Sequence, residues 1–150
     1  MKELTPSEEL KHLKVIFGES PPAGIYNNLI SSFTIIQTRA QILLSLATIC
    51  LTITGFSGPK IAESNMISRY SIALGIIFVL ISIGFVLSGP LRIKWATQLF
   101  IENIDKTMEV LIQRRNLKTT QYHQSMFFLA IGLSFYVVSV VSFLVLGKSQ

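Results

Sequence analysis

The sequence predicts an all-α integral membrane protein, with three transmembrane helices extended into a cytoplasmic helical stub and a short N-terminal amphipathic helix. Of the 150 residues, 50% are hydrophobic and only 14% are charged, and the mean hydropathy is +0.55. Three stretches contain no Asp, Glu, Lys or Arg: Ala40–Pro59, Tyr70–Leu91 and Thr119–Gly147. Each is long enough to cross a hydrocarbon core of about 30 Å as a helix. This composition excludes a soluble globule, a disulfide-stabilised secreted domain and a disordered chain.

Residues 1–24 are expected to form an amphipathic helix followed by a Pro/Gly linker. The run Thr5-Pro6-Ser7-Glu8 has the pattern of a helix start, with Thr5 as the N-cap and Glu8 closing a capping box. Leu10, Leu13 and Phe17 then fall on one face of the helix. This face predicts either a helix lying on the membrane or one docked on the rest of the protein.

Residues 25–150 are expected to form a single membrane domain, with spans at about 40–58, 70–91 and 122–146. Nothing interrupts a helix from Ile25 until Gly55, Gly58 and Pro59, so the first span is predicted to be the membrane half of a longer helix. Gly58-Pro59 is predicted to close that helix, and a polar loop would lead to Tyr70. Gly89-Pro90 is predicted to interrupt the second helix at the cytoplasmic boundary.

The segment 92–118 is predicted to be a cytoplasmic helical hairpin. A straight helix over this segment would end roughly 36 Å from the membrane, and the few residues before the third span could not bring the chain back. A turn near Asn103–Lys106 solves this problem, because Asn and Asp cap helices well. A helix lying flat on the membrane is the alternative.

The distribution of Lys and Arg predicts the orientation. Ten of the 13 lie before the first span or between the second and third, and Lys60, Arg69 and Lys148 lie on the other side. We therefore expect a multi-pass protein of the inner cell membrane, with a cytoplasmic N-terminus and the C-terminus outside. Membrane topology accounts for the net charge of +5, so no nucleic-acid partner is predicted. The predicted anchors at the membrane interfaces are Arg39, Tyr70, Arg92, Lys94 and Trp95.

A polar seam runs along the first long helix. It alternates steps of four and three residues, which places it on one face, and it consists of Asn27, Ser31, Thr34, Thr38, Gln41, Ser45, Thr48, Thr52 and Gly55. At membrane depth this face is expected to turn towards protein or water and away from lipid. Two interpretations stay open: a packing interface between helices, and the lining of a water-filled pore in a ring of subunits.

The spans also differ in how strongly they prefer lipid. At roughly −0.5 kcal/mol per central Leu, Ile, Val or Phe, the first span gains about 4 kcal/mol on insertion and the others about 6 and 7. The first span is therefore expected to be innermost in an assembly. On the second span, small residues form a stripe that lets another helix approach closely: Ser71, Gly75, Ser82 and Gly89.

The sequence offers no catalytic constellation, no metal site and no cofactor motif, so no enzymatic activity is predicted. No acidic residue lies in any span, and Cys50 is the only cysteine. The basic segment with Lys106, Arg114, Arg115 and Lys118 fits attraction to anionic lipid. A cytoplasmic protein or a nucleotide signal is the alternative ligand of this segment.

The pattern over about 25–146 resembles small bacterial membrane effectors of anti-phage defence, the Pycsar effector and SLATT-type families. The features that carry the resemblance are Thr38-Arg39-Ala40 leading into the first span, Gly89-Pro90 ending the second, and Lys118-Thr119-Thr120-Gln121-Tyr122 re-entering the membrane. The resemblance implies oligomerisation and membrane disruption after a signal reaches a cytoplasmic part. We therefore expect a homo-oligomeric, pore-forming or membrane-disrupting effector whose first helices line the centre. The alternative is a non-conducting anchor or accessory subunit that recruits a cytoplasmic partner.

Overall fold

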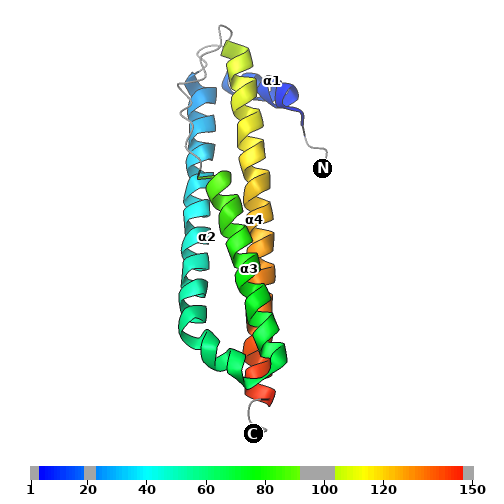
Figure 1. The fold of residues 1–150 in the computed structure, drawn as a ribbon. Helices are drawn as coiled ribbons and strands as arrows, with labels where there is room; N and C mark the ends of the chain where they lie inside the picture. Colours follow the sequence, from blue (N-terminus) through cyan, green and yellow to red (C-terminus); the bar gives the residue numbers. More distant parts are fainter. Residues whose placement is uncertain (1–3, 19–22, 92–103, 147–150) are drawn as a thin grey trace.

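The computed structural model describes residues 4–18, 23–91 and 104–146. These residues form four helices and no strand: α1 (Pro6–Phe17), α2 (Ala23–Ser64), α3 (Met66–Ser88) and α4 (Ile104–Leu146). In Figure 1, α2 and α4 run in one direction and α3 returns between them, so the two chain ends lie at opposite ends of an elongated bundle. The helices α2, α3 and α4 are long and apolar enough to cross a membrane. The predicted all-helical fold with three candidate spans is confirmed.

The predicted end of the first long helix at Gly58-Pro59 is wrong. The helix continues through Pro59 to Ser64, and Figure 1 shows that it bends sharply before it meets the base of α3. Proline lacks the N–H that would continue the hydrogen-bond ladder, so it bends the helix. Beyond the bend Ile61 is buried, with only 6% of its surface exposed, and this burial favours further helix over the predicted polar loop.

The second span begins earlier than predicted and ends where predicted. Asn65 is the N-cap of α3, and its side chain accepts a hydrogen bond of 2.8 Å from the Ser68 amide. The helix therefore starts at Met66 and not at Tyr70. It ends at Ser88, and the chain turns at Gly89-Pro90, where the Gly89 amide donates to the Phe85 carbonyl at 3.1 Å.

The third span belongs to a helix that begins far outside the apolar run. α4 is 43 residues long and starts at Ile104, inside the segment where the hairpin was predicted to turn. The second arm of the predicted hairpin is therefore continuous with the third span. The first arm, residues 92–103, lies outside the described residues, so the hairpin itself stays a prediction.

The N-terminal helix α1 docks on the other helices. Its predicted capping box is present, and hydrogen bonds from the Thr5 amide and hydroxyl to the Glu8 carboxylate lower the pKa of Glu8. Of the predicted apolar face, Leu10 is buried and Leu13 packs beside it, whereas Phe17 is 41% exposed. The buried cluster around Leu10 consists of Ile25, Leu29, Met108, Leu111 and Ile112.

Two ion pairs fix α1 in this position. The Arg115 guanidinium contacts both carboxylate oxygens of Glu9 at 2.8 Å, and Lys14 Nζ lies 2.7 Å from Asp105. In each pair one residue belongs to α1 and the other to α4. The structure thus has α1 docked on the protein, in a place where it ties the first turns of α2 to those of α4 (Figure 1).

Candidate functional site

The polar seam lies on the outside of the bundle. All of its residues are exposed, including the six at the centre of the predicted site, Thr34, Thr38, Gln41, Ser45, Thr48 and Thr52. The opposite face of α2 packs inwards and buries Ala40, Leu43, Ala47 and Thr54. At 3.6 residues per turn, the seam and the packed face are separated by roughly 140° around the helix axis. Neither α3 nor α4 covers the seam within one chain.

The seam hydroxyls donate hydrogen bonds within their own helix. Thr38 donates to the Thr34 carbonyl at 2.9 Å, Ser45 to Gln41 at 3.0 Å, and Thr48 to Leu44 at 2.9 Å. Thr34 and Thr52 make the same bond to the residue four positions earlier. These donors need neither water nor a neighbouring helix. The expectation that Ser and Thr at these positions must avoid lipid is therefore too strong.

Gln41 differs from the rest of the seam. Its side chain is exposed and makes no hydrogen bond to the part of the chain that the structure describes. An amide has two N–H donors and a carbonyl acceptor, and leaving them unpaired in hydrocarbon costs several kcal/mol by order of magnitude. Gln41 thus needs a polar neighbour or water, whereas the hydroxyls already donate to carbonyls of their own helix.

The predicted small-residue stripe is buried against α4. Ser71, Gly75, Ser82 and Gly89 all lie in the interior. A Cβ added to Gly75 would lie 3.1 Å from the carbonyl oxygen of Gly132, and one added to Gly89 would clash with the Gln121 side chain. The stripe therefore lets α3 and α4 approach closely within one chain.

Sequence reasoning missed the matching row on α4. Ser125, Gly132 and Ser139 face Ser82, Gly75 and Ser68 in order along the antiparallel pair. The signal was present, because Ser68, Gly75, Ser82 and Gly89 are spaced by seven and the α4 residues are spaced by seven as well. Two rows with the same period predict a pair of close-packed helices.

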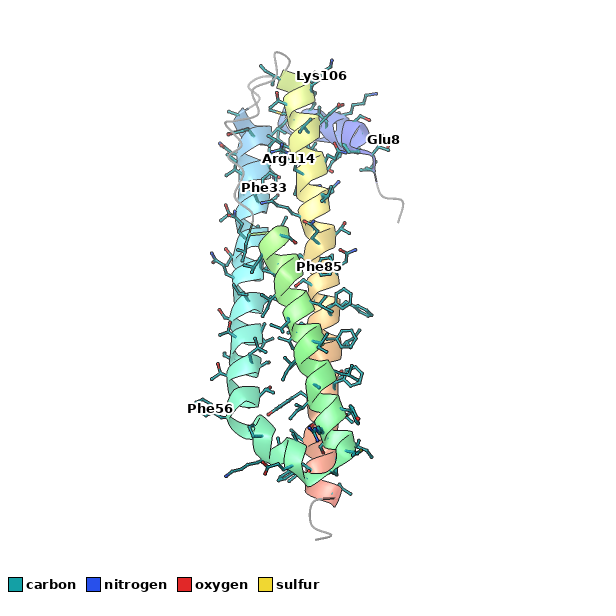
Figure 2. The ribbon with its side chains drawn as sticks, in the orientation of Figure 1. Glu8, Phe33, Phe56, Phe85, Lys106 and Arg114 are labelled. Atoms are coloured by element: carbon teal, nitrogen blue, oxygen red, sulfur yellow. The ribbon has the colours of Figure 1, made fainter. Side chains whose placement is uncertain are left out.

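Serine pairs lock the register of the two rows. Ser82 Oγ donates to the Ser125 carbonyl at 2.7 Å, and Ser125 Oγ donates to the Ser82 carbonyl at 3.1 Å. Ser68 and Ser139 repeat this exchange at 3.2 and 3.0 Å. Beside them, Phe78 stacks between Phe128 and Phe135, and Phe85 stacks on Phe128 at 5.4 Å between ring centroids. α3 and α4 thus form one closely packed unit (Figure 2).

The charged residues at the N-terminal end of α4 serve mostly internal contacts. Lys118 Nζ donates to the Pro90 carbonyl at 3.2 Å and lies 5.6 Å from the centroid of the Phe33 ring. A cation at this position stabilises the carbonyl-rich end of α3. Arg115 holds Glu9, and Arg114 beside it is half-buried. Lys106 is exposed at the N-terminal end of α4 (Figure 2).

The predicted interface anchors are described only in part. Arg39 is exposed on α2, directly before Ala40, which packs in one cluster with Val86 near the end of α3. Tyr70 is 64% exposed near the start of α3. Arg92, Lys94 and Trp95 lie outside the described residues. Both described anchors are exposed, and their place at a membrane interface stays a prediction.

No group of three His, Cys, Asp or Glu residues that could hold a metal occurs in the described ranges. A small cavity between α2, α3 and α4 is lined by Cys50, Thr54, Gly75, Gly132 and Tyr136, among others. It has room for about one water molecule. Comparison of the chain with protein-family models, curated proteins and solved structures gave no significant match. The resemblance to defence effectors therefore stays a prediction.

Proposed function

We propose that this protein is a homo-oligomeric membrane protein in which the α2 helices surround a water-filled pore. The N-terminus and α1 would lie in the cytoplasm, as the Lys and Arg bias indicates. The observation that carries the proposal is the exposed polar seam, which continues over the full apolar length of α2 on the side opposite α3 and α4. Membrane permeabilisation by such an assembly would fit a role as a defence effector.

The difference between α2 and the α3–α4 pair supports this arrangement. α3 is the most buried of the three candidate spans, with 33% of its most apolar window buried, whereas the figure for α2 is 17%. The α3–α4 unit exposes large apolar side chains that suit lipid, such as Leu80, Phe127 and Val141, and α2 carries the polar seam. A ring with the seams inward would place each α3–α4 unit on the lipid side, so the least lipid-like helix would be innermost.

Replacing a seam residue at mid-membrane tests the proposal. Thr48→Leu would make the predicted pore narrower and less easily wetted, so it is expected to abolish conduction without changing the oligomeric state. Ser134→Leu is the matched control, because Ser134 is also exposed and its hydroxyl also donates to a carbonyl four residues earlier, but it lies on α4. The measurement is dye or ion flux from vesicles that contain the purified protein.

Three outcomes separate the interpretations. Loss of flux in Thr48→Leu alone supports the pore. Equal flux in both variants would contradict it. Loss of the oligomer in Thr48→Leu would show that the seam is a packed interface, which an added side chain disturbs first.

The anchor function has one observation of its own. On α1, Val15 and Ile16 are 83% and 69% exposed, although Leu10 on the other side of the helix is docked. An exposed apolar face outside the candidate spans fits a cytoplasmic partner protein. Recovery of one stable partner, lost on Val15→Ser with Ile16→Ser, together with an absence of flux, would favour the anchor.

A further inference from the structure

Beside the polar seam, α2 presents an apolar ridge to the outside. The ridge consists of Ile35, Ile42, Leu46, Ile49, Ile53 and Phe56. These residues alternate steps of seven, four and three, so they form a second row roughly 100° around the helix from the seam. All are exposed, and Phe56, the most exposed of them at 84%, points away from α3 and α4 in Figure 2.

From this placement we infer that the apolar ridge is the subunit interface, and that its partner is the α2 helix of a second copy of this chain. The inference rests on the proposed function, because it assumes that the seams face a common centre. When the seam faces inwards, the surfaces on both sides of it must meet neighbouring subunits. One of these surfaces is the ridge.

The other side of the seam has a complementary shape. Leu44 and Leu51 are half-buried there. Gly55, the last residue of the seam, lies on the edge nearest to them and leaves an open notch, since a Cβ built on it would meet no atom within 4 Å. In a ring that is symmetric about the membrane normal, equivalent residues of all subunits lie at the same depth. Phe56 of one subunit would therefore reach the Gly55 notch of its neighbour, and Ile49 would reach Leu51.

The ridge also extends beyond the part that lipid can cover. Ile35 is 50% exposed and precedes Arg39, the predicted anchor at the cytoplasmic interface. An exposed isoleucine at this level gains nothing from lipid tails. A second α2 of the same 42 residues would cover the ridge along its whole length.

A pair of cysteines tests the contact. In a Cys50→Ser background, Ile49→Cys with Leu51→Cys places the two thiols on different sides of α2, so they cannot join within one helix. Oxidation in membranes is expected to give a ladder of dimers, trimers and larger species. Val137→Cys with Val138→Cys is the control on the outer face of α4, where the two side chains likewise do not face each other and are about equally exposed, at 57% and 50%. It is expected to remain monomeric on denaturing gels.

Single substitutions test the ridge contact further. Ile49→Cys alone is expected to give no crosslink, because a ring joins different surfaces of two neighbours; dimers from this variant would overturn the inference in favour of a two-fold contact. Gly55→Leu fills the notch and is expected to remove the ladder. Gly84→Leu fills an equally open position on α3 and is expected to leave it intact.

Failure of the inference and failure of the proposed function have different signatures. The oligomeric state of the same preparations is read by mass measurement in lipid. An oligomer without a ladder would overturn the ridge contact and leave the pore proposal standing. A monomer that supports no flux would overturn both.

Discussion

The interface between α3 and α4 and the outer face of α2 contain the same small polar residues in opposite roles. In the interface, Ser82 and Ser125 donate to each other's carbonyls, so each hydroxyl joins two helices. On the outer face, Thr48 and Thr52 donate to carbonyls of their own helix and join nothing. The difference shows that small polar residues in a membrane helix mark a close contact only where a matching row faces them.

Glycine replacement in the interface is expected to have the largest effect. Gly75→Leu forces a side chain into the Gly132 backbone, where even a Cβ would lie 3.1 Å from the carbonyl oxygen. We expect a loss of about 1–3 kcal/mol or more in the free energy of unfolding in detergent. Gly84→Leu, on the same helix with nothing within 4 Å, should cost close to nothing. Similar losses in both variants would contradict a close-packed α3–α4 unit.

Removing hydroxyls is expected to lower the stability of the α3–α4 interface but not that of the outer face of α2. The loss should be smaller than for the glycine replacement. Ser82→Ala and Ser125→Ala should be coupled by about 0.6 kcal/mol in a double-mutant cycle, because each loses a bond across the helices. Thr48→Ala should leave the stability of the protomer unchanged, because no partner helix loses a contact. A cost for Thr48→Ala in the monomer equal to that of Ser82→Ala would remove the distinction.

The docking of α1 on α4 should respond to the loss of one ion pair. Glu9→Arg is expected to release α1 by about 0.2–1 kcal/mol, since the Glu9 and Arg115 side chains are each 21% exposed and solvent screens the pair. Proteolysis of α1 should become faster, and the exchanged pair Glu9→Arg with Arg115→Glu should restore protection. The α3–α4 unit should be unaffected. Unchanged proteolysis in Glu9→Arg would contradict the docked position of α1.

Several elements could be predicted because their signals are local. The capping box at Thr5 and Glu8, the break at Gly89-Pro90 and the three charge-free runs each act within one helix or span. The inward role of Gly75 and Ser82 also followed from spacing alone. Long-range contacts gave no such signal: the docking of α1 depends on Glu9 and Arg115, which are 106 residues apart.

The residue spacing predicts the face of α2 on which the seam lies, but not the hydrogen bonds of its hydroxyls, and the function of the seam stays a prediction. Spacing placed the seam on one face of α2, and the structure leaves that face exposed. The hydrogen bonds of the seam hydroxyls to their own helix depend on side-chain rotamers, which a residue pattern does not specify. The helix end predicted at Pro59 is wrong for a different reason: burial of Ile61 beyond it is a tertiary contact, which favours further helix and which the local pattern does not contain.

The most direct test of the central claim is the reactivity of single cysteines in intact membranes towards a hydrophilic thiol reagent. Thr48→Cys and Thr52→Cys on the seam are compared with Ser134→Cys and Val141→Cys on α4, all in a Cys50→Ser background. We expect fast labelling at both seam positions and none at the two α4 positions, although all four are exposed in one chain. Unreactive seam cysteines in an assembled oligomer would contradict a water-filled pore lined by α2.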